Sequence, residues 1–272
     1  MSFEQPPEEQ FNKEGAEQEN YDPKEAIKDK LSGGYLESVE KIAEENNINE
    51  GVVKELVREG VLDDFGKRHH KDTLDILERF KIGKDFLKNK DFVRLGKERV
   101  ELKLSQGNID AANEVLEDLN IDKEFLKGEE AKKAAETGIK NILAGDKTDK
   151  AIEVQKMFNI DDSFMNGAVE DEIKVRLKDN LVVGAVSLQK KFNIPQEFIN
   201  DAVKEEVLAR FSAGSSLGSI ASFIEKLNMD IAFLGDPKIK EATKIRIKEM
   251  TESEIRGQEK IPEIFKEVKE VN

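Results

Sequence analysis

The stretch Ile121-Asp122-Lys123-Glu124-Phe125-Leu126 decides the fold of this chain, because variants of it occur six times along the 272 residues. The first residue of each copy, called the lead residue below, is Ile48, Ile82, Ile121, Ile160, Ile194 or Met229. Successive lead residues are 34, 39, 39, 34 and 35 positions apart. Repeats of this length are typical of stacked helical hairpins. The spacing therefore predicts an all-α solenoid of about six helical hairpins.

Each copy has the features of a helix start. The residue after the lead residue is Asn or Asp in four copies, and such side chains accept hydrogen bonds from the first helical turn. Pro195 holds this position in the fifth copy and fits a first turn, where its missing N–H costs nothing. In this register the first and sixth residues form a hydrophobic staple. The fifth residues are predicted to lie in the core between helices: Val52, Phe86, Phe125, Phe164, Phe198 and Phe233.

Between the copies, the pattern predicts a first helix, a turn and a second helix. Glycine near the middle of most repeats permits the left-handed backbone that ends a helix, and Asp179-Asn180 replaces it in the fourth repeat. The second and third repeats contain about five extra residues, and we expect longer first helices there. A mostly small column nine residues before each lead residue predicts close helix packing: Val39, Thr73, Ala112, Ala151, Ala185 and Ile220.

The composition predicts three segments. Residues 1–25 contain eight acidic residues against two lysines, with few apolar side chains to bury. We expect residues 1–22 to form a disordered acidic tail. Residues 23–257 are expected to form the solenoid, and residues 258–272 a C-terminal capping helix, because terminal repeats need a polar outer face.

Charge and composition exclude several classes of protein. Lys and Arg number 44 against 58 Asp and Glu, so the net charge of −14 argues against bulk affinity for nucleic acid. Without cysteine the chain has no disulfide and no thiolate metal site. The first residues lack the pattern of a secretory signal, and no apolar run approaches the ~18 residues that span a bilayer. We expect a cytoplasmic protein without a membrane partner; its oligomeric state stays open.

The sequence predicts no catalytic, cofactor or metal site. His69 and His70 are the only histidines, and adjacent residues on a helix point about 100° apart, which suits a metal pair poorly. We expect both to be exposed loop residues between two helices. Carboxylates are too abundant to single out a catalytic pair. The chain is therefore predicted not to be an enzyme.

One basic column is the candidate binding site. Just before the apolar residue that closes the first helix stand Lys30, Lys103, Arg176 and Arg210. One interpretation is a basic ladder that holds an acidic peptide or a nucleic-acid backbone. The other is that these cations complement the carbonyl end of the helix dipole and need no ligand.

Two second-helix stretches resemble a known family. Gly107-Asn108-Ile109-Asp110-Ala111-Ala112-Asn113-Glu114-Val115-Leu116 and Gly145-Asp146-Lys147-Thr148-Asp149-Lys150-Ala151-Ile152-Glu153-Val154 are similar to tetratricopeptide and pentatricopeptide repeats, in which Ala and an apolar pair follow a turn Gly. The Trp-Leu-Gly-Tyr features of tetratricopeptide helices are absent. The resemblance implies a right-handed αα-solenoid with a binding role, and pentatricopeptide repeats bind single-stranded RNA.

Architecture and the lack of a catalytic signature lead to one functional prediction. The chain is expected to be a non-enzymatic scaffold without cofactors that binds a peptide or protein partner along its concave face. The alternative is single-stranded RNA binding through the basic ladder on the first helices.

Overall fold

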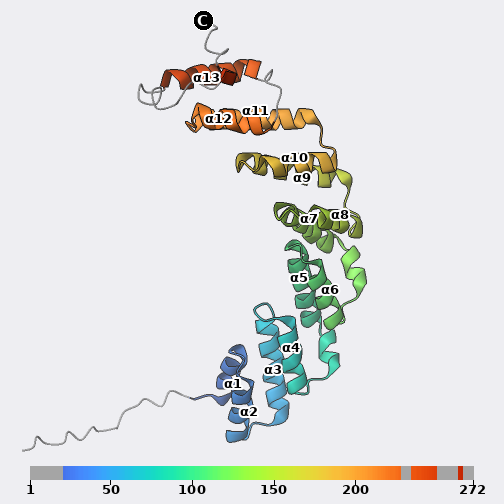
Figure 1. The fold of residues 1–272 in the computed structure, drawn as a ribbon. Helices are drawn as coiled ribbons and strands as arrows, with labels where there is room; N and C mark the ends of the chain where they lie inside the picture. Colours follow the sequence, from blue (N-terminus) through green and yellow to red (C-terminus); the bar gives the residue numbers. More distant parts are fainter. Residues whose placement is uncertain (1–20, 228–233, 250–262, 266–272) are drawn as a thin grey trace, which may run out of the picture. The chain divides into compact units, whose positions relative to one another are not determined.

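All regular structure in the described part of the chain is helical (Figure 1). The computed structural model describes residues 21–227, 234–249 and 263–265. These ranges contain thirteen α-helices, short 3-10 helices and no strand. The predicted all-α class is confirmed. Most of the predicted acidic tail and of the capping helix lies outside the described residues, but Asp22 is the N-cap of the first helix and accepts from Lys24 N at 2.9 Å.

The α-helices follow one another as six consecutive pairs and a final helix, coloured from blue to red in Figure 1. Their bounds are α1 Pro23–Ser32, α2 Leu36–Glu45, α3 Glu50–Asp64, α4 His70–Arg79, α5 Lys90–Ser105, α6 Ile109–Asp118, α7 Glu129–Ala144, α8 Thr148–Met157, α9 Asp162–Lys178, α10 Val182–Phe192, α11 Gln196–Ser212, α12 Leu217–Lys226 and α13 Pro237–Glu249.

The chain divides into two compact units. The first comprises residues up to 97 with 117–121, and the second comprises residues 98–116 with those from 122 onward. In the first unit α1 packs against α2 and α3, and α3 packs against α4. In the second unit α7 contacts α8 and α9, α9 contacts α10 and α11, and α11 contacts α13. The first helices α1, α7 and α9 therefore each contact both a second helix and the next first helix.

The predicted helix starts are confirmed where the motif leads directly into an α-helix. Asn49 accepts from Gly51 N at 2.7 Å, and Asp161 accepts from Phe164 N at 2.9 Å. Pro195 is the N-cap residue of α11 rather than its first residue. Met229 and its copy of the motif lie almost entirely outside the described residues.

The fifth residues of the motif are less buried than predicted. Phe164 and Phe198 are half-buried, while the following residues Met165 and Ile199 are only 2% exposed. Lys140 Nζ lies 5.8 Å from the ring centroid of Phe164, and Lys174 Nζ lies 5.6 Å from that of Phe198. The lysines thus cover ring faces that the core leaves open, because an ammonium is attracted to the negative face of an aromatic ring.

The extra residues of the second and third repeats form separate 3-10 helices, so the prediction of longer first helices is wrong. The 3-10 helices are η1 (Lys84–Lys88) and η2 (Lys123–Lys127), and the following α5 and α7 each have 16 residues, against 17 in α9 and α11. Asn89 Oδ1 accepts from Asp91 N at 2.9 Å and starts a new helix. Gly128, with φ −75° and ψ 158°, interrupts the helix before α7 in the same way.

Left-handed residues end the helices at both ends of the hairpins. The residue before each lead residue has a φ of 47° to 52° where it is described: Asn47, Lys81, Asn120, Asn159 and Asn193. At the hairpin turns the left-handed residues are Gly34, Gly107, Asp146, Asn180 and Gly214. The predicted replacement of glycine by Asn180 is confirmed, since its φ is 61°. Asparagine tolerates this conformation better than most residues that carry a side chain.

The small column of the second helices is confirmed as core. All six of its members are at most 1% exposed: Val39, Thr73, Ala112, Ala151, Ala185 and Ile220. Among the described residues, none of the helices is both long and apolar enough to cross a bilayer.

Candidate functional site

The four residues of the predicted basic column lie in different surroundings. Lys30 is exposed at the end of α1, with Nζ 5.6 Å from the ring centroid of Tyr35. Lys103 is half-buried in the last turn of α5. Arg176 and Arg210 lie in the last turns of α9 and α11, two first helices that pack against each other.

The Arg176 guanidinium is held inside the fold. The residue is only 4% exposed. Its Nε donates to Glu172 Oε1 at 2.7 Å, its Nη2 donates to the carbonyl of Leu143 at 2.7 Å, and its Nη1 donates to Asp146. Burial lowers the pKa of the Arg176 guanidinium, but the hydrogen bonds to Glu172 and Asp146 outweigh it and raise the pKa above its usual value. The donors of this cation are therefore engaged within the chain.

Arg210 repeats the arrangement one hairpin later. Its Nε donates to Glu206 at 2.7 Å, four residues earlier on α11, and its Nη2 donates to the carbonyl of Leu177 at 3.2 Å. Its guanidinium carbon lies 4.1 Å from the ring centroid of Phe223 on α12. Arg210 thus links two first helices and one second helix.

These contacts belong to a recurring device, which we call the carbonyl clamp. In each case a side chain near the end of one first helix, or in the turn that follows it, donates to a backbone carbonyl near the end of the preceding first helix. The donor and acceptor pairs are Arg68 and Leu31, Asn141 and Ser105, Arg176 and Leu143, Arg210 and Leu177, and Arg246 and Ser215. The carbonyls of Leu31, Leu143 and Leu177 also accept a backbone N–H from their own turn, so there the clamp adds a second donor, from the next repeat, to the end of the helix. The sequence pattern suggested cations complementing a helix end; the structure shows that the end belongs to the neighbouring helix.

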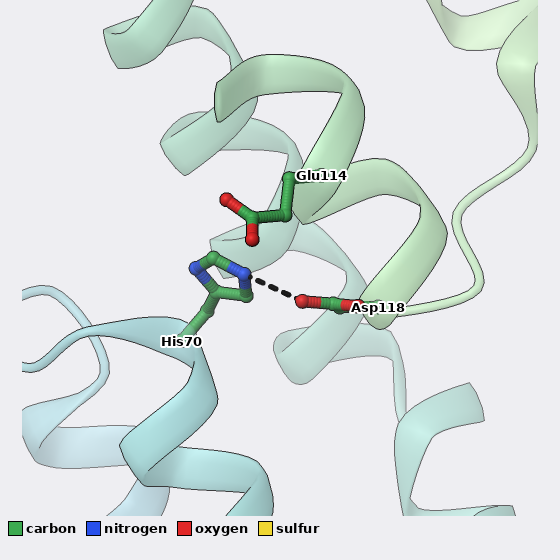
Figure 2. A group of neighbouring side chains, drawn as sticks. All are labelled: His70, Glu114 and Asp118. Carbon is green, nitrogen blue, oxygen red and sulfur yellow. Dashed lines mark hydrogen bonds and ion pairs between the residues drawn. The ribbon is translucent and has the colours of Figure 1, made fainter. Parts of the chain in front are cut away.

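The two histidines differ from the prediction of exposed loop residues. His69 is exposed and caps α4, accepting from Lys71 N at 3.4 Å, whereas His70 is the first residue of α4 and only 1% exposed. Nε2 of His70 lies 2.9 Å from Oδ2 of Asp118. Figure 2 marks this contact with a dashed line between the two side chains.

The histidine contact is an ion pair or hydrogen bond within the first unit. Asp118 ends α6, and Glu114, also drawn in Figure 2, precedes it by one helical turn and is counted with the second unit. The contact holds the start of α4 against the end of α6.

Two grooves form at equivalent positions of different repeats. The α2–α4 groove, of about 650 Å³, lies between the end of α2, the start of α3 and the end of α4, and its lining includes Glu40, Glu44, Glu50, Lys54, Arg79 and Phe80. The α10–α12 groove, of about 740 Å³, lies between the corresponding parts of α10, α11 and α12, and its lining includes Val183, Val186, Lys190, Gln196, Ile199 and Lys226. Counted from the lead residues, the equivalent pairs are Glu40 and Val186, Glu44 and Lys190, Glu50 and Gln196, and Arg79 and Lys226.

The α2–α4 groove contains its own ion pairs. Arg79 Nη1 lies 2.8 Å from Glu37, and its Nε and Nη2 bind Glu40 at 3.0 and 2.9 Å. Lys54 lies 2.8 Å from Glu50. Hydrogen bonds from Arg79 hold the pKa values of both Glu37 and Glu40 below their usual range. Cations and acids in this groove therefore neutralise one another.

The α10–α12 groove lacks acids and exposes apolar surface. No acidic residue is among its described lining residues, which include Lys190 and Lys226. Val183 is 85% exposed at its edge, and Leu181, two residues earlier, is 58% exposed. The sequence signal for this groove was visible but missed: the acids Glu37 and Glu40 are replaced by Val183 and Val186, while a cation remains at the position of Arg79.

Comparisons with known proteins add no neighbour: no family model, curated protein or solved structure matches this chain.

Proposed function

We propose that this chain is a non-enzymatic binding protein, a right-handed α-solenoid that holds a segment of a partner polypeptide. The stacking of first helices supports the solenoid, since α7, α9, α11 and α13 contact one another in chain order. Side chains thirty or more residues apart join successive first helices through the carbonyl clamps. Such stacking presents extended grooves, which helical-repeat proteins use for binding.

The observation that carries this proposal is the α10–α12 groove. It combines the exposed Val183 and the half-buried Val186 with amide side chains and two lysines, a mixture that suits a polypeptide better than a polyanion. Exposed apolar side chains beside polar groups are typical of protein interaction sites.

RNA binding through Lys30, Lys103, Arg176 and Arg210 is the less favoured function. Arg176 is buried, and its guanidinium nitrogens donate to Glu172, Asp146 and a backbone carbonyl. Phosphate contacts would have to compete with these bonds, so the structure offers no observation in favour of the ladder as an RNA site.

Cross-linking tests the proposed function. The purified full chain is added to a cell lysate and cross-linked, and adducts are scored separately for protein and for RNA. We expect reproducible protein adducts that persist when salt is raised. RNA adducts alone, lost steeply as salt rises, would replace this proposal with the RNA alternative.

A further inference from the structure

Two pairs of second helices are joined by an ion pair at equivalent positions, and the α10–α12 groove lacks this pair. In the first unit Arg79 of α4 pairs with Glu37 of α2 at 2.8 Å. In the second unit Lys191 of α10 pairs with Asp149 of α8 at 2.7 Å. Both cations lie three residues before a lead residue, and both acids lie eleven residues before the preceding one.

At the next step of this series the acid is missing. The residue three before Met229 is Lys226, and the residue eleven before Ile194 is Val183. Lys226 and Lys190 have no ion-pair partner among the part of the chain that the structure describes. The groove thus keeps the cation of the series and exposes a valine where the acid stood.

We infer that this groove binds an acidic segment of a partner protein, which places carboxylates against Lys190 and Lys226 and an aliphatic or aromatic side chain against Val183 and Val186. The inference rests on the proposed polypeptide-binding function and specifies its site and its partner chemistry.

The polar wall of the groove suits the main chain of an extended peptide. Gln189 donates to Gln196 at 2.8 Å, and Gln196 donates to Asn200 at 3.0 Å, so three amide side chains line one wall. Amides offer both donors and acceptors, as a peptide backbone requires. Pro195 gives α11 no side-chain cap, whereas Asn49 caps the equivalent α3, so the N-terminal N–H groups of α11 add a positive end to this wall.

The net charge of −14 does not oppose an acidic partner at this site. Charges beyond about 8 Å are largely screened at physiological salt, so the lysines of the groove decide the local potential. A lysine pair flanked by the exposed Val183 and the half-buried Val186 selects for acids beside apolar residues, which is a different requirement from that of the self-neutralised α2–α4 groove.

The test begins with selection of random peptides displayed on phage against the full chain. Selected peptides are synthesised, and their affinities are measured by fluorescence anisotropy for the wild type and for Lys190→Glu/Lys226→Glu. The control is Lys156→Glu/Lys178→Glu, which makes the same charge change at two exposed lysines outside the groove. Lys156 is the matched residue for Lys190, four residues before the preceding lead residue.

We expect the selected peptides to combine Asp or Glu with aliphatic or aromatic residues. The groove variant should weaken their binding at least about tenfold, and the control should change it less than about twofold. Peptides in which Lys replaces the acids should bind the groove variant better than the wild type. Circular dichroism of each variant checks that the helices are retained.

Four outcomes would overturn the inference. Selected peptides without acids, or acidic peptides that bind the groove variant as tightly as the control, would leave polypeptide binding intact and move it to another surface. Displacement of the peptides by polyuridine would assign the lysines to RNA, and self-association abolished by the groove variant would assign the groove to a second copy of the chain. Failure of the proposed function is separate: it would show as an absence of protein adducts in the lysate experiment.

Discussion

Arg176 and Arg210 show how one residue type at one position can serve stability in this fold. Each extends a guanidinium between a carboxylate four residues earlier and a carbonyl of the preceding first helix. Charge-assisted hydrogen bonds of this kind are about twice as strong as neutral ones. Their acceptors, the Leu143 and Leu177 carbonyls, also accept from Asp146 N and Asn180 N, so the arginines add a side-chain hydrogen bond between neighbouring repeats to helix ends that are already capped.

Replacing Arg176 by Met should destabilise the protein. Glu172, whose side chain is 13% exposed, would lose its cation, and the Leu143 carbonyl would lose one of its donors. We expect the free energy of unfolding to fall by about 2–4 kcal/mol, as when one partner of a buried pair is removed. Urea unfolding followed by circular dichroism measures the change.

Lys103→Met is the control for Arg176→Met, because Lys103 occupies the same column and is half-buried. Its substitution should change the free energy of unfolding by less than about 0.5 kcal/mol. Equal losses in the two variants would mean that the clamp at Arg176 does not stabilise the fold.

Asp64 should make the stability of the protein depend on pH. A hydrogen bond from Lys67 at 2.8 Å holds the pKa of Asp64 below its usual value, against the opposite effect of burial. Because the folded pKa is depressed, the unfolded chain binds protons first as pH falls from neutral. The stability that Asp64 contributes is present above the unfolded pKa of about 3.9 and is lost as pH falls through the lower folded pKa.

We therefore expect the stability difference between the wild type and Asp64→Asn to be largest near neutral pH and to shrink below about pH 4. Urea titrations across this range measure it, with Asp63→Asn at an exposed neighbour as the comparison. A difference that stays constant from neutral pH to acid would contradict the proposed role of the ionised Asp64.

At the scale of elements, the ends of helices carry most of the regularity of this fold. Four of the five left-handed residues that precede described lead residues are Asn, and the fifth is Lys81. The repeated lead motif starts either an α-helix directly or a 3-10 helix that is followed by one. In the second case Asn89 or Gly128 follows the 3-10 helix and starts the α-helix.

Lys81 should be a stabilising site for glycine. Its φ of 52° is unfavourable for a residue with a Cβ by about 1–2 kcal/mol, and glycine would remove this cost. Part of the stability gained is lost again, because the unfolded chain is more flexible at a glycine. We expect Lys81→Gly to raise the free energy of unfolding by up to about 1 kcal/mol. Lys41→Gly, at an exposed position inside α2, should lower it by about 1 kcal/mol. The same sign in both variants would contradict this explanation.

Gly138 should tolerate no side chain. A Cβ added there would clash with the backbone carbonyl oxygen of Leu104, because α7 approaches the end of α5 closely at this point. Gly138→Ala is expected to lower the free energy of unfolding by about 1–3 kcal/mol through overpacking. At Gly167 in α9 nothing lies within 4 Å of an added Cβ, and Gly167→Ala should raise stability by up to about 1 kcal/mol. Thermal unfolding of the two variants would show shifts of opposite sign.

At the scale of the molecule, the two compact units suggest local rather than global unfolding. In the proposed solenoid each repeat is stabilised by its neighbours alone, so a defect spreads only as far as adjacent repeats remain coupled. Val57 in α3 and Val203 in α11 are both fully buried and lie in different units.

Hydrogen exchange of the full chain tests this coupling. Val57→Ala is expected to lower the free energy of unfolding by about 1–3 kcal/mol. It should therefore accelerate exchange in α1–α4 and leave exchange in α9–α12 unchanged. Val203→Ala should produce the reverse pattern. Accelerated exchange throughout the chain in either variant would show a single cooperative unit.

The sequence by itself determined the helical hairpins and most helix ends. An N-cap such as Asp161 or a left-handed Asn180 acts through hydrogen bonds and backbone angles within a few residues, so its role can be inferred from neighbours in the chain. Small residues such as Ala151 also predicted close packing, since a small side chain lets a neighbouring helix approach closely.

Only the tertiary structure determined which partners the charged side chains bind. Arg176 reaches a carbonyl 33 residues away, and His70 reaches a carboxylate 48 residues away. Such pairs depend on how repeats stack, which no local pattern specifies. The α10–α12 groove follows the same rule, because Val183 and Lys226 matter as a pair only when their helices meet around one groove.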